Sequence, residues 1–327
     1  MTGVDVRPGP FAHELLTSWL ARVAVHSGCE PLVLTGAIWP GWRIWTVDAD
    51  RQLSAERAQV AAIWFKLPVE RVCASTLLEV SKKLHGSADS RRPLWPWILA
   101  QGSRNRLRRA GLPFCPKCLA NDAQPYYRLE WRLAWVVGCK LHGVRLVDRC
   151  DRCHAICEPH RSTAATGDLA HCVECGFDLR RSMCGSVCDL ALSFQRRADD
   201  IFGREWAAWG DERVSRMEWF QRARSLLAND LCQVNGQSAV AMGYRQIGLS
   251  FELQGPMERE ARLKALEGFL NGDAPPSVRH TDRGRIPRPS QLSHVKKFRV
   301  RRARTSPLAR ERVQKAWARW LRRNRLW

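Results

Sequence analysis

Four short pairs of metal-ligand residues recur between positions 115 and 175 of this chain. They read CPKC, CKLH, CDRC and CVEC, and together they contain seven cysteines and one histidine. Two residues separate the members of each pair, which lets one tight turn aim both side chains at a single ion. Zn²⁺ takes four cysteine or histidine ligands in a tetrahedron. Eight ligands make two complete sets, so we expect this stretch to fold around two zinc ions.

Taken in chain order, the ligands form a Cys₃His set and a Cys₄ set. The first set is Cys115, Cys118, Cys139 and His142, and the second is Cys150, Cys153, Cys172 and Cys175. The sequence leaves an interleaved pairing open. Disulfides or buried free thiols would explain neither the repeated spacing nor a histidine in a ligand position. Because four protein ligands leave no position for a water, both zinc sites are predicted to be structural.

The residues between and around the ligand pairs are as distinctive as the pairs. They read FCPKCLANDAQPYYRLEWRLAWVVGCKLHGVRLVDRCDRC and HCVECGFDLR, with HELLTSWLAR and IWTVDADR upstream. In this order, over about residues 8 to 181, they resemble the TniQ family of target-selection proteins from bacterial transposons. Unrelated zinc proteins have no reason to share Tyr-Tyr-Arg, Trp-Arg-Leu and Cys-Lys-Leu-His-Gly between the same ligand pairs.

The resemblance implies a function as well as a fold. A TniQ-like protein would be bacterial and associated with the nucleoid, and it would have a helix-turn-helix-like N-terminal domain. It would bind target DNA or a target-marking complex and recruit an AAA+ ATPase, which in turn recruits the transposase. Whether a guide-RNA complex is a partner, and whether the protein forms a homodimer, differs between family members and stays open here.

The charge of the chain is concentrated at its C-terminal end. The net charge is +21, and residues 279–327 hold 17 Lys or Arg against two acids. Such asymmetry points to a polyanion, and DNA is favoured over a membrane because the tail has no large continuous apolar face. No run of about 20 apolar residues and no secretory leader are present, so we expect a soluble cytoplasmic protein.

Arginines that follow Trp95 and Trp97, together with the basic tail, supply the candidate DNA contacts. Arginine beside aromatic side chains can hold phosphates and stack on bases, although a solvated charged face is the alternative. The candidates are Arg104, Arg106, Arg108, Arg109, Lys296, Lys297, Arg299, Arg301, Arg302, Arg304, Arg319, Arg322 and Arg323.

Outside the ligand pairs the pattern is mainly helical, with the zinc knuckles as small β or loop modules. We predict an N-terminal helix-turn-helix-like domain (1–110), a tandem zinc-binding region (111–182), an all-α C-terminal domain (183–272) and a basic linker and C-terminal helix or arm (273–327). Apolar residues at helical spacing predict helices over 11–27, 54–67 and 68–84, with Ser54 as an N-cap. The Trp-rich segment 37–51 is predicted to be a loop clamped by its tryptophans.

Residues 126–138 fit either a helix or a strand, and we favour the helix. Its aromatic residues Tyr126, Tyr127, Trp131 and Trp135 are predicted to be core, with Arg128 and Arg132 facing outward. Arg22 is predicted to be a solvated charge or a partner contact. The six remaining cysteines are expected to be small buried hydrophobes, with spare zinc ligands as the alternative for Cys184 and Cys188.

The chain is not expected to be an enzyme. It has no Gly-rich phosphate loop followed by Lys and Ser or Thr, and its acids are too scattered to gather two metal ions. Asp48 and Asp50 lie close together, but the sequence identifies no partners for them. A His-Asn-His nuclease would need two histidines downstream of the cysteine pairs, which RRSMCGSVCDLALSF does not supply. A zinc-containing DNA-binding regulator unconnected with transposition is the main alternative to a transposition adaptor.

Overall fold

The computed structural model describes residues 8–87, 95–101, 111–228 and 250–272. The chain divides into two units, Met1–Ser277 and Val278–Trp327, and every described residue belongs to the first. The described part is rich in helices and has a single two-stranded sheet, as the sequence predicted for a mainly helical chain. The domain boundaries at 110, 182 and 272 stay a prediction.

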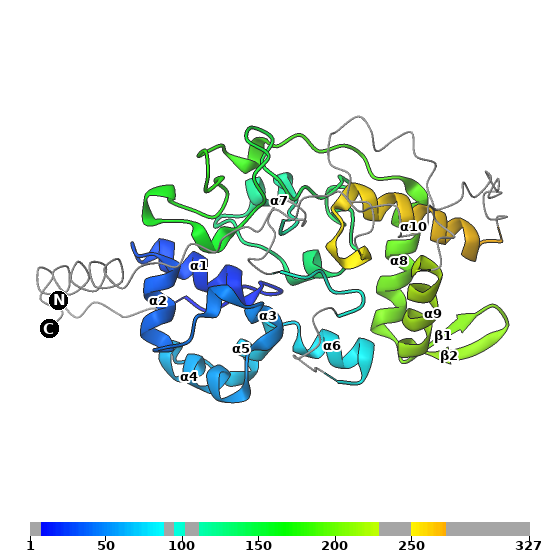
Figure 1. Ribbon diagram of the computed structural model, residues 1–327, viewed down its shortest axis with the longest axis horizontal. Helices are drawn as coiled ribbons and strands as arrows, with labels where there is room; N and C mark the ends of the chain where they lie inside the picture. The colour runs from blue at the N-terminus through cyan, green and yellow to red at the C-terminus, as the bar shows by residue number, and fades with distance from the viewer. Residues whose placement is uncertain (1–7, 88–94, 102–110, 229–249, 273–327) are drawn as a thin grey trace, which may run out of the picture. The chain divides into compact units, whose positions relative to one another are not determined.

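Six helices form the N-terminal part (Figure 1). They are α1 (Leu16–His26), α2 (Pro31–Ile38), α3 (Ala49–Gln52), α4 (Ala55–Phe65), α5 (Val69–Ala74) and α6 (Leu78–His85). Helix α1 is buried along most of its length, and Trp19 and Leu20 are fully enclosed. It begins five residues later than predicted, because Glu14 pairs with Arg128 in an isolated β-bridge and His13 has a positive φ of 61°.

The helices α4 to α6 show where tertiary contacts override local pattern. Ser54 caps α4 as predicted, since its hydroxyl accepts from the Arg57 amide at 3.3 Å. The predicted helix over 68–84 is broken into α5 and α6, because Ser75 and Leu77 form backbone hydrogen bonds with Leu16 and with Asp50. The α4–α5 pair is joined by three residues, and its assignment as a helix-turn-helix remains a prediction.

The Trp-rich segment after α2 is clamped to the body by its indoles, as expected. Trp39 donates to the carbonyl of Arg57 at 3.1 Å, and Trp45 donates to the Thr35 hydroxyl at 3.0 Å. Trp45 also stacks on His160, which lies between the second and third cysteine of the Cys₄ set, with ring centres 5.3 Å apart. These contacts hold the irregular backbone between α2 and α3 against two other parts of the fold.

Residues 111–182, which contain the eight candidate metal ligands, consist of loops, isolated β-bridges, the helix α7 (Pro116–Asn121) and short 3₁₀ turns. The helix that we favoured over residues 126–138 is wrong, because only Leu129–Arg132 forms a single 3₁₀ turn. Backbone hydrogen bonds from Leu15 to Tyr127 and from Leu129 to His13 hold the segment extended against the N-terminus. Tyr127, Trp131 and Trp135 are buried, as predicted, whereas Tyr126 is only half-buried.

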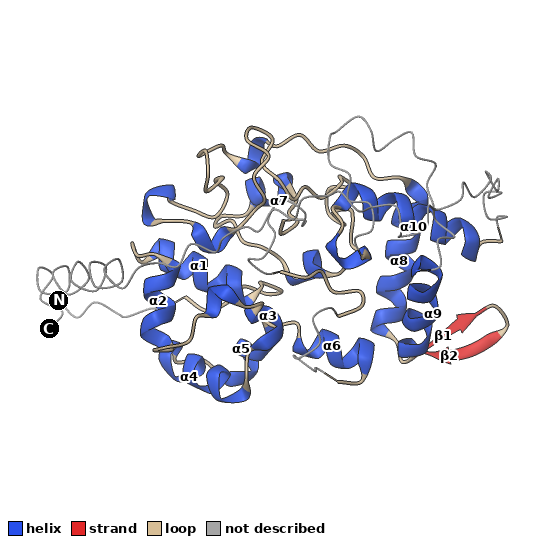
Figure 2. Ribbon diagram, in the orientation of Figure 1, coloured by secondary structure: helices blue, strands red, loops and turns tan. Residues whose placement is uncertain are grey.

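Three helices and a hairpin make up the C-terminal part. They are α8 (Asp189–Gly203), β1 (Trp206–Trp209), β2 (Glu212–Ser215), α9 (Arg216–Ala228) and α10 (Pro256–Leu270). The prediction of an all-α domain is therefore wrong over residues 206–215, where the antiparallel hairpin lies beside α9 (Figure 2). Gly210, with a φ of 60°, supplies the left-handed conformation that the tight turn requires.

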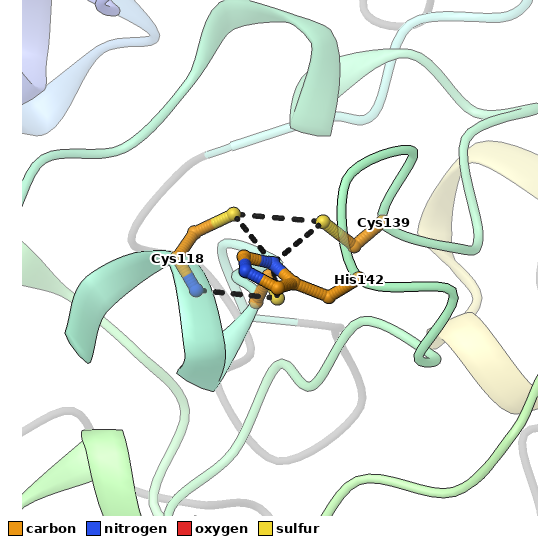
Figure 3. A group of neighbouring side chains, drawn as sticks. Cys118, Cys139 and His142 are labelled. Atoms are coloured by element: carbon orange, nitrogen blue, oxygen red, sulfur yellow. Dashed lines mark hydrogen bonds between the residues drawn. The ribbon is translucent and has the colours of Figure 1, made fainter. Parts of the chain in front are cut away.

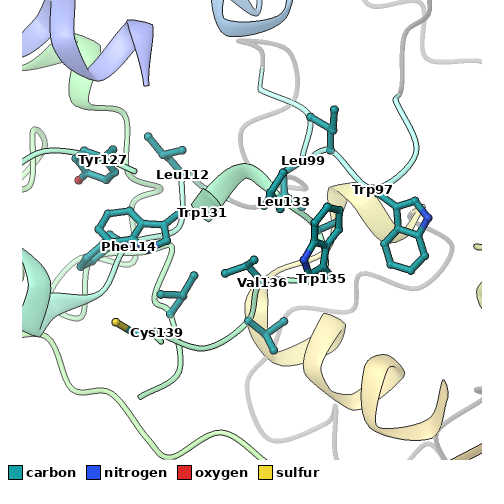
Figure 4. Packing of buried hydrophobic residues seen from close by; sticks show 14 of the residues in the cluster. Trp97, Leu99, Leu112, Phe114, Tyr127, Trp131, Leu133, Trp135, Val136 and Cys139 are labelled. Atoms are coloured by element: carbon teal, nitrogen blue, oxygen red, sulfur yellow. The ribbon is translucent and has the colours of Figure 1, made fainter. Parts of the chain in front are cut away.

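The described residues form two hydrophobic cores: a smaller one within α1 to α5, and a larger one that joins these parts (Figure 4). The Trp97 ring lies 5.6 Å from the rings of Phe220 and Phe251 and about 6 Å from those of Trp135 and Phe194. Its indole donates to the carbonyl of Phe220 at 2.8 Å. The segment that carries the candidate metal ligands and the C-terminal helices therefore share one interior. Among the described helices, none has the length and apolar character needed to cross a membrane.

Candidate metal centres

The first group of ligands is assembled from two tight turns. Cys115 precedes α7 and Cys118 lies within it, so Pro116 at the first helical position fixes the turn between them. Cys139 and His142 lie on a second turn (Figure 3), which ends at Gly143 with a φ of 64°. The local sequence thus brings each pair of side chains to the same side of its own turn, and the fold brings the two turns together.

The distances in this group fit one tetrahedral ion. Cys118 Sγ lies 3.5 Å from Cys139 Sγ, and His142 Nδ1 lies 3.4 to 3.6 Å from the sulfurs of all three cysteines. All four ligand atoms lie within 4.8 Å of one another. A tetrahedron with Zn–S bonds of about 2.3 Å has S–S edges of ~3.8 Å, so an ion of this size matches the space.

The second group has the same construction with four thiols. Cys150 and Cys175 place their sulfurs 3.6 Å apart, and so do Cys153 and Cys172. The four sulfurs again lie within 4.8 Å of one another. The turns close at His154 and Gly176, which both have positive φ. The structure brings the ligands together in chain order, as a Cys₃His group and a Cys₄ group, and not in the interleaved alternative.

Crowding of the thiols perturbs their acidity. Hydrogen bonds with Cys115 and Cys118 hold the pKa of the Cys139 thiol well below its usual range, and hydrogen bonds with Cys115 and Cys139 raise the pKa of the Cys118 thiol. Burial raises the pKa of Cys150 to about 12. Several thiolates cannot coexist at this spacing without a cation between them, so this donor set suits a divalent ion such as Zn²⁺.

His142 has a neighbour that can fix its orientation. Its Nδ1 faces the three sulfurs, and its Nε2 lies 3.1 Å from the side-chain amide of Asn121. With Nδ1 on an ion, Nε2 would carry the proton, and the Asn121 amide, whose Nδ2 is the atom at 3.1 Å, would accept the hydrogen bond through its oxygen after a flip of the amide. Such outer contacts hold a ligating imidazole in one tautomer and one orientation.

A buried ion-pair cluster around Arg132 was missed from the sequence. Arg132 is 0% exposed and lies 2.6 Å from Asp48 and 2.8 Å from Asp50, and it also donates to the carbonyl of Leu99. Thr17 donates to Asp50 through both its amide and its hydroxyl at 2.9 Å. The cluster joins α1 and α3 to the segment between the two ligand turns of the first group.

Three arginines that we expected at the surface lie inside or pair with acids. Arg132 was predicted to face outward and is enclosed by the cluster described above. Arg128 pairs with Asp122 at 2.8 Å. Arg22 is 4% exposed and pairs with Glu14 at 2.7 Å, so it is neither solvated nor available to a partner. Each pairs with an acid that short-range periodicity does not identify.

The remaining predicted residues divide between three outcomes. Cys184 and Cys188 lie outside both ligand groups, and Cys157 is buried, as expected of a small hydrophobe. Cys29, Cys73, Cys184 and Cys188 are only half-buried, so the prediction of buried thiols is wrong for these four. Cys232 lies outside the described residues. So do all the candidate DNA contacts, both those after Trp97 and those in the C-terminal tail, and their role stays a prediction.

Residues 6–146 match the family model of TniQ. The match includes the whole first ligand group and ends before Cys150, so it is shorter than the likeness that we expected up to about residue 181. A comparison with curated proteins finds no match.

Proposed function

Because residues 6–146 make this chain a member of the TniQ family, we propose that it is a zinc-stabilised adaptor of transposition. In this role it binds target DNA or a target-marking complex and recruits the AAA+ ATPase of the transposon, and through the ATPase the transposase. The family match is the observation that carries the proposal. The adaptor itself neither cuts nor joins DNA.

The two ligand groups support a structural role for zinc in such an adaptor. Each group offers four protein ligands, which leaves no coordination position for a water or a substrate. The first group lies in the part of the chain that also holds Trp131 and Arg132, which reach into the core and the ion-pair cluster. Zinc at this position would stiffen the platform on which the N-terminal helices rest.

DNA binding would be shared between separate parts of the chain. The α4–α5 pair would act as the helix-turn-helix-like module, and the basic segment 279–327 would hold phosphates along the backbone. Each phosphate neutralised on duplex DNA lowers log K by about 0.9 per decade of salt, so binding through this segment should be strongly salt-dependent.

A zinc-containing DNA-binding regulator remains the second candidate. Residues 147–327 lie outside the family match, and they hold the Cys₄ group and the basic tail, which suit any DNA-binding protein. Gene neighbourhood separates the two candidates at once, because an adaptor requires genes for an ATPase and a transposase beside its own.

The decisive experiment measures retention of that ATPase on DNA. Zinc-quantified protein is added to immobilised DNA at two salt concentrations, with ATP and the ATPase present or absent. Retention of the ATPase that depends on this protein supports the adaptor. Tight, sequence-specific DNA binding that leaves the ATPase in solution supports the regulator instead.

A further inference from the structure

The β1–β2 hairpin has one structural face and one free face. The register places Trp206, Ala208, Arg213 and Ser215 together on the outer face. The opposite face attaches the hairpin to the fold: Val214 is buried, the Trp209 ring packs 5.9 Å from that of Trp219, and Glu212 pairs with Arg222 at 2.7 Å. Ser215 accepts a hydrogen bond from the Glu218 amide at 3.2 Å at the start of α9, whereas Trp206, Ala208 and Arg213 lie on the side away from the contacts that hold the hairpin in place.

Trp206 and Arg213 form an exposed aromatic and cationic surface on this outer face. Trp206 is 50% exposed, and the guanidinium carbon of Arg213 lies 5.2 Å from the centre of its ring. Their neighbours on this face, Ala208 and Ser215, are too small to cover the indole. An indole beside a guanidinium on a rigid strand is the combination that stacks an unpaired base and holds the adjoining phosphate.

The charged residues around the hairpin have a small excess of positive charge, which suits contact with a short stretch of a polyanion. In the described part of the chain, Lys83, Arg213 and Arg216 form no ion pair, and Arg216 is held at the base of the hairpin by backbone carbonyls, including that of Lys83. Three exposed acids lie on the same hairpin or at its start, and Glu212 pairs with Arg222, which leaves Glu205 and Asp211 to face these three cations. Three cations against two acids favour contact with one or two phosphates.

We propose that the outer face of the hairpin binds a DNA strand with unpaired bases, with a base stacked on Trp206 and a phosphate paired with Arg213. This inference rests on the proposed function, because it assigns one DNA contact of the adaptor. Asp211 occupies the turn, where it would repel the phosphates that flank a duplex groove. The strand therefore lies across the outer face, and the hairpin does not insert its turn into a groove.

The test compares binding of the full-length protein to a single-stranded oligonucleotide and to a duplex by fluorescence anisotropy. Loss of one base-stacking contact weakens affinity about 5- to 150-fold, so Trp206→Ala should show a loss in this range for the single strand. Trp206→Phe should restore most of the affinity. Arg213→Gln should also flatten the salt dependence by roughly 0.7 in log K per decade of salt.

Arg196→Gln is the matched control, because it removes one exposed charge from α8, away from the hairpin. An equal loss in Arg196→Gln and Arg213→Gln would overturn the inference, since it would mean that only total charge matters. Unchanged DNA binding in Trp206→Ala would overturn it too. If Trp206→Ala binds DNA normally and still retains the ATPase on DNA as well as the wild type does, the proposed function stands without this contact. If Trp206→Ala binds DNA normally but no longer retains the ATPase, the outer face contacts a protein and not DNA.

Discussion

Replacing Arg132 with Met tests the buried ion-pair cluster directly. The substitution keeps most of the side-chain volume and leaves the Asp50 carboxylate buried without its cation, while Asp48 keeps only the more distant Arg51, at 4.0 Å. Breaking a buried pair by removing one member costs about 3–5 kcal/mol in the free energy of unfolding. Because the entropy of unfolding is about 2.1 cal/mol/K per residue, 1 kcal/mol corresponds to roughly 1.5–2 °C for a protein of this size, and the melting temperature should fall by roughly 5–10 °C.

The loss of stability in Arg132→Met should also depend on pH. Burial raises the pKa of Asp50 from 3.8 to about 6 in the folded protein, against the opposing effect of Arg132. A carboxyl whose pKa is raised by folding contributes stability that is complete below its unfolded pKa and is lost as the pH rises through its folded pKa. Without Arg132 that pKa rises further. The destabilisation of Arg132→Met should therefore be smaller at pH 5 than at pH 8.

Arg222→Met is the matched control, because Arg222 also bridges two carboxylates, those of Glu212 and Glu218, but is 35% exposed. A surface pair contributes about 0–1 kcal/mol. Thermal unfolding of the zinc-loaded proteins at pH 5 and pH 8 gives both comparisons. The reasoning is refuted if Arg132→Met costs no more than Arg222→Met, or if its cost is larger at pH 5.

Three further predictions concern zinc and DNA. Cys118→Ser or Cys153→Ser should lose one equivalent of zinc by elemental analysis and unfold at a lower temperature. Cys184→Ser, which lies outside both groups, should keep two equivalents. Full zinc content in Cys118→Ser and Cys153→Ser would refute the ligand assignment. Asn121→Ala should weaken zinc binding at the first group about 10- to 100-fold in a chelator competition, and an unchanged affinity would show that the amide does not position His142. Deleting residues 279–327 should leave the melting temperature unchanged while it weakens DNA binding and flattens its salt slope, and unchanged binding would place the DNA surface elsewhere.

The two ligand groups could be predicted because each pair of ligands is specified by four consecutive residues of the sequence. Each pair of ligands is separated by two residues, and a turn of that length has few ways to place its side chains. The pairing of the two turns was the open question, and the structure answers it through Phe114 and Val147, whose backbone bridge aligns the strands around the first group. Spacing alone carries no information on that bridge.

The hairpin and the ion-pair cluster could not be predicted in the same way. Trp206 and Trp209 are three residues apart, a spacing that fits a helix as well as the two faces of a short strand, and we interpreted it as helical. Arg132 and Asp48 are 84 positions apart, so their contact has no periodic signature. A charged residue on an apparently polar helix face is normally solvated, and only the folded chain shows that this one is enclosed.

The central place of Trp97 has a consequence for synthesis of the chain. Its ring is covered by Phe194, Phe220 and Phe251, and its amide donates to Glu252 at 3.1 Å, so the residues that enclose it are made long after it. At about 5–20 residues per second, the last of them leaves the ribosome roughly 8–30 s after Trp97. During that interval the nascent chain exposes a large indole next to its first metal-binding turns. We expect a nascent chain of this kind to be a chaperone client until α10 emerges.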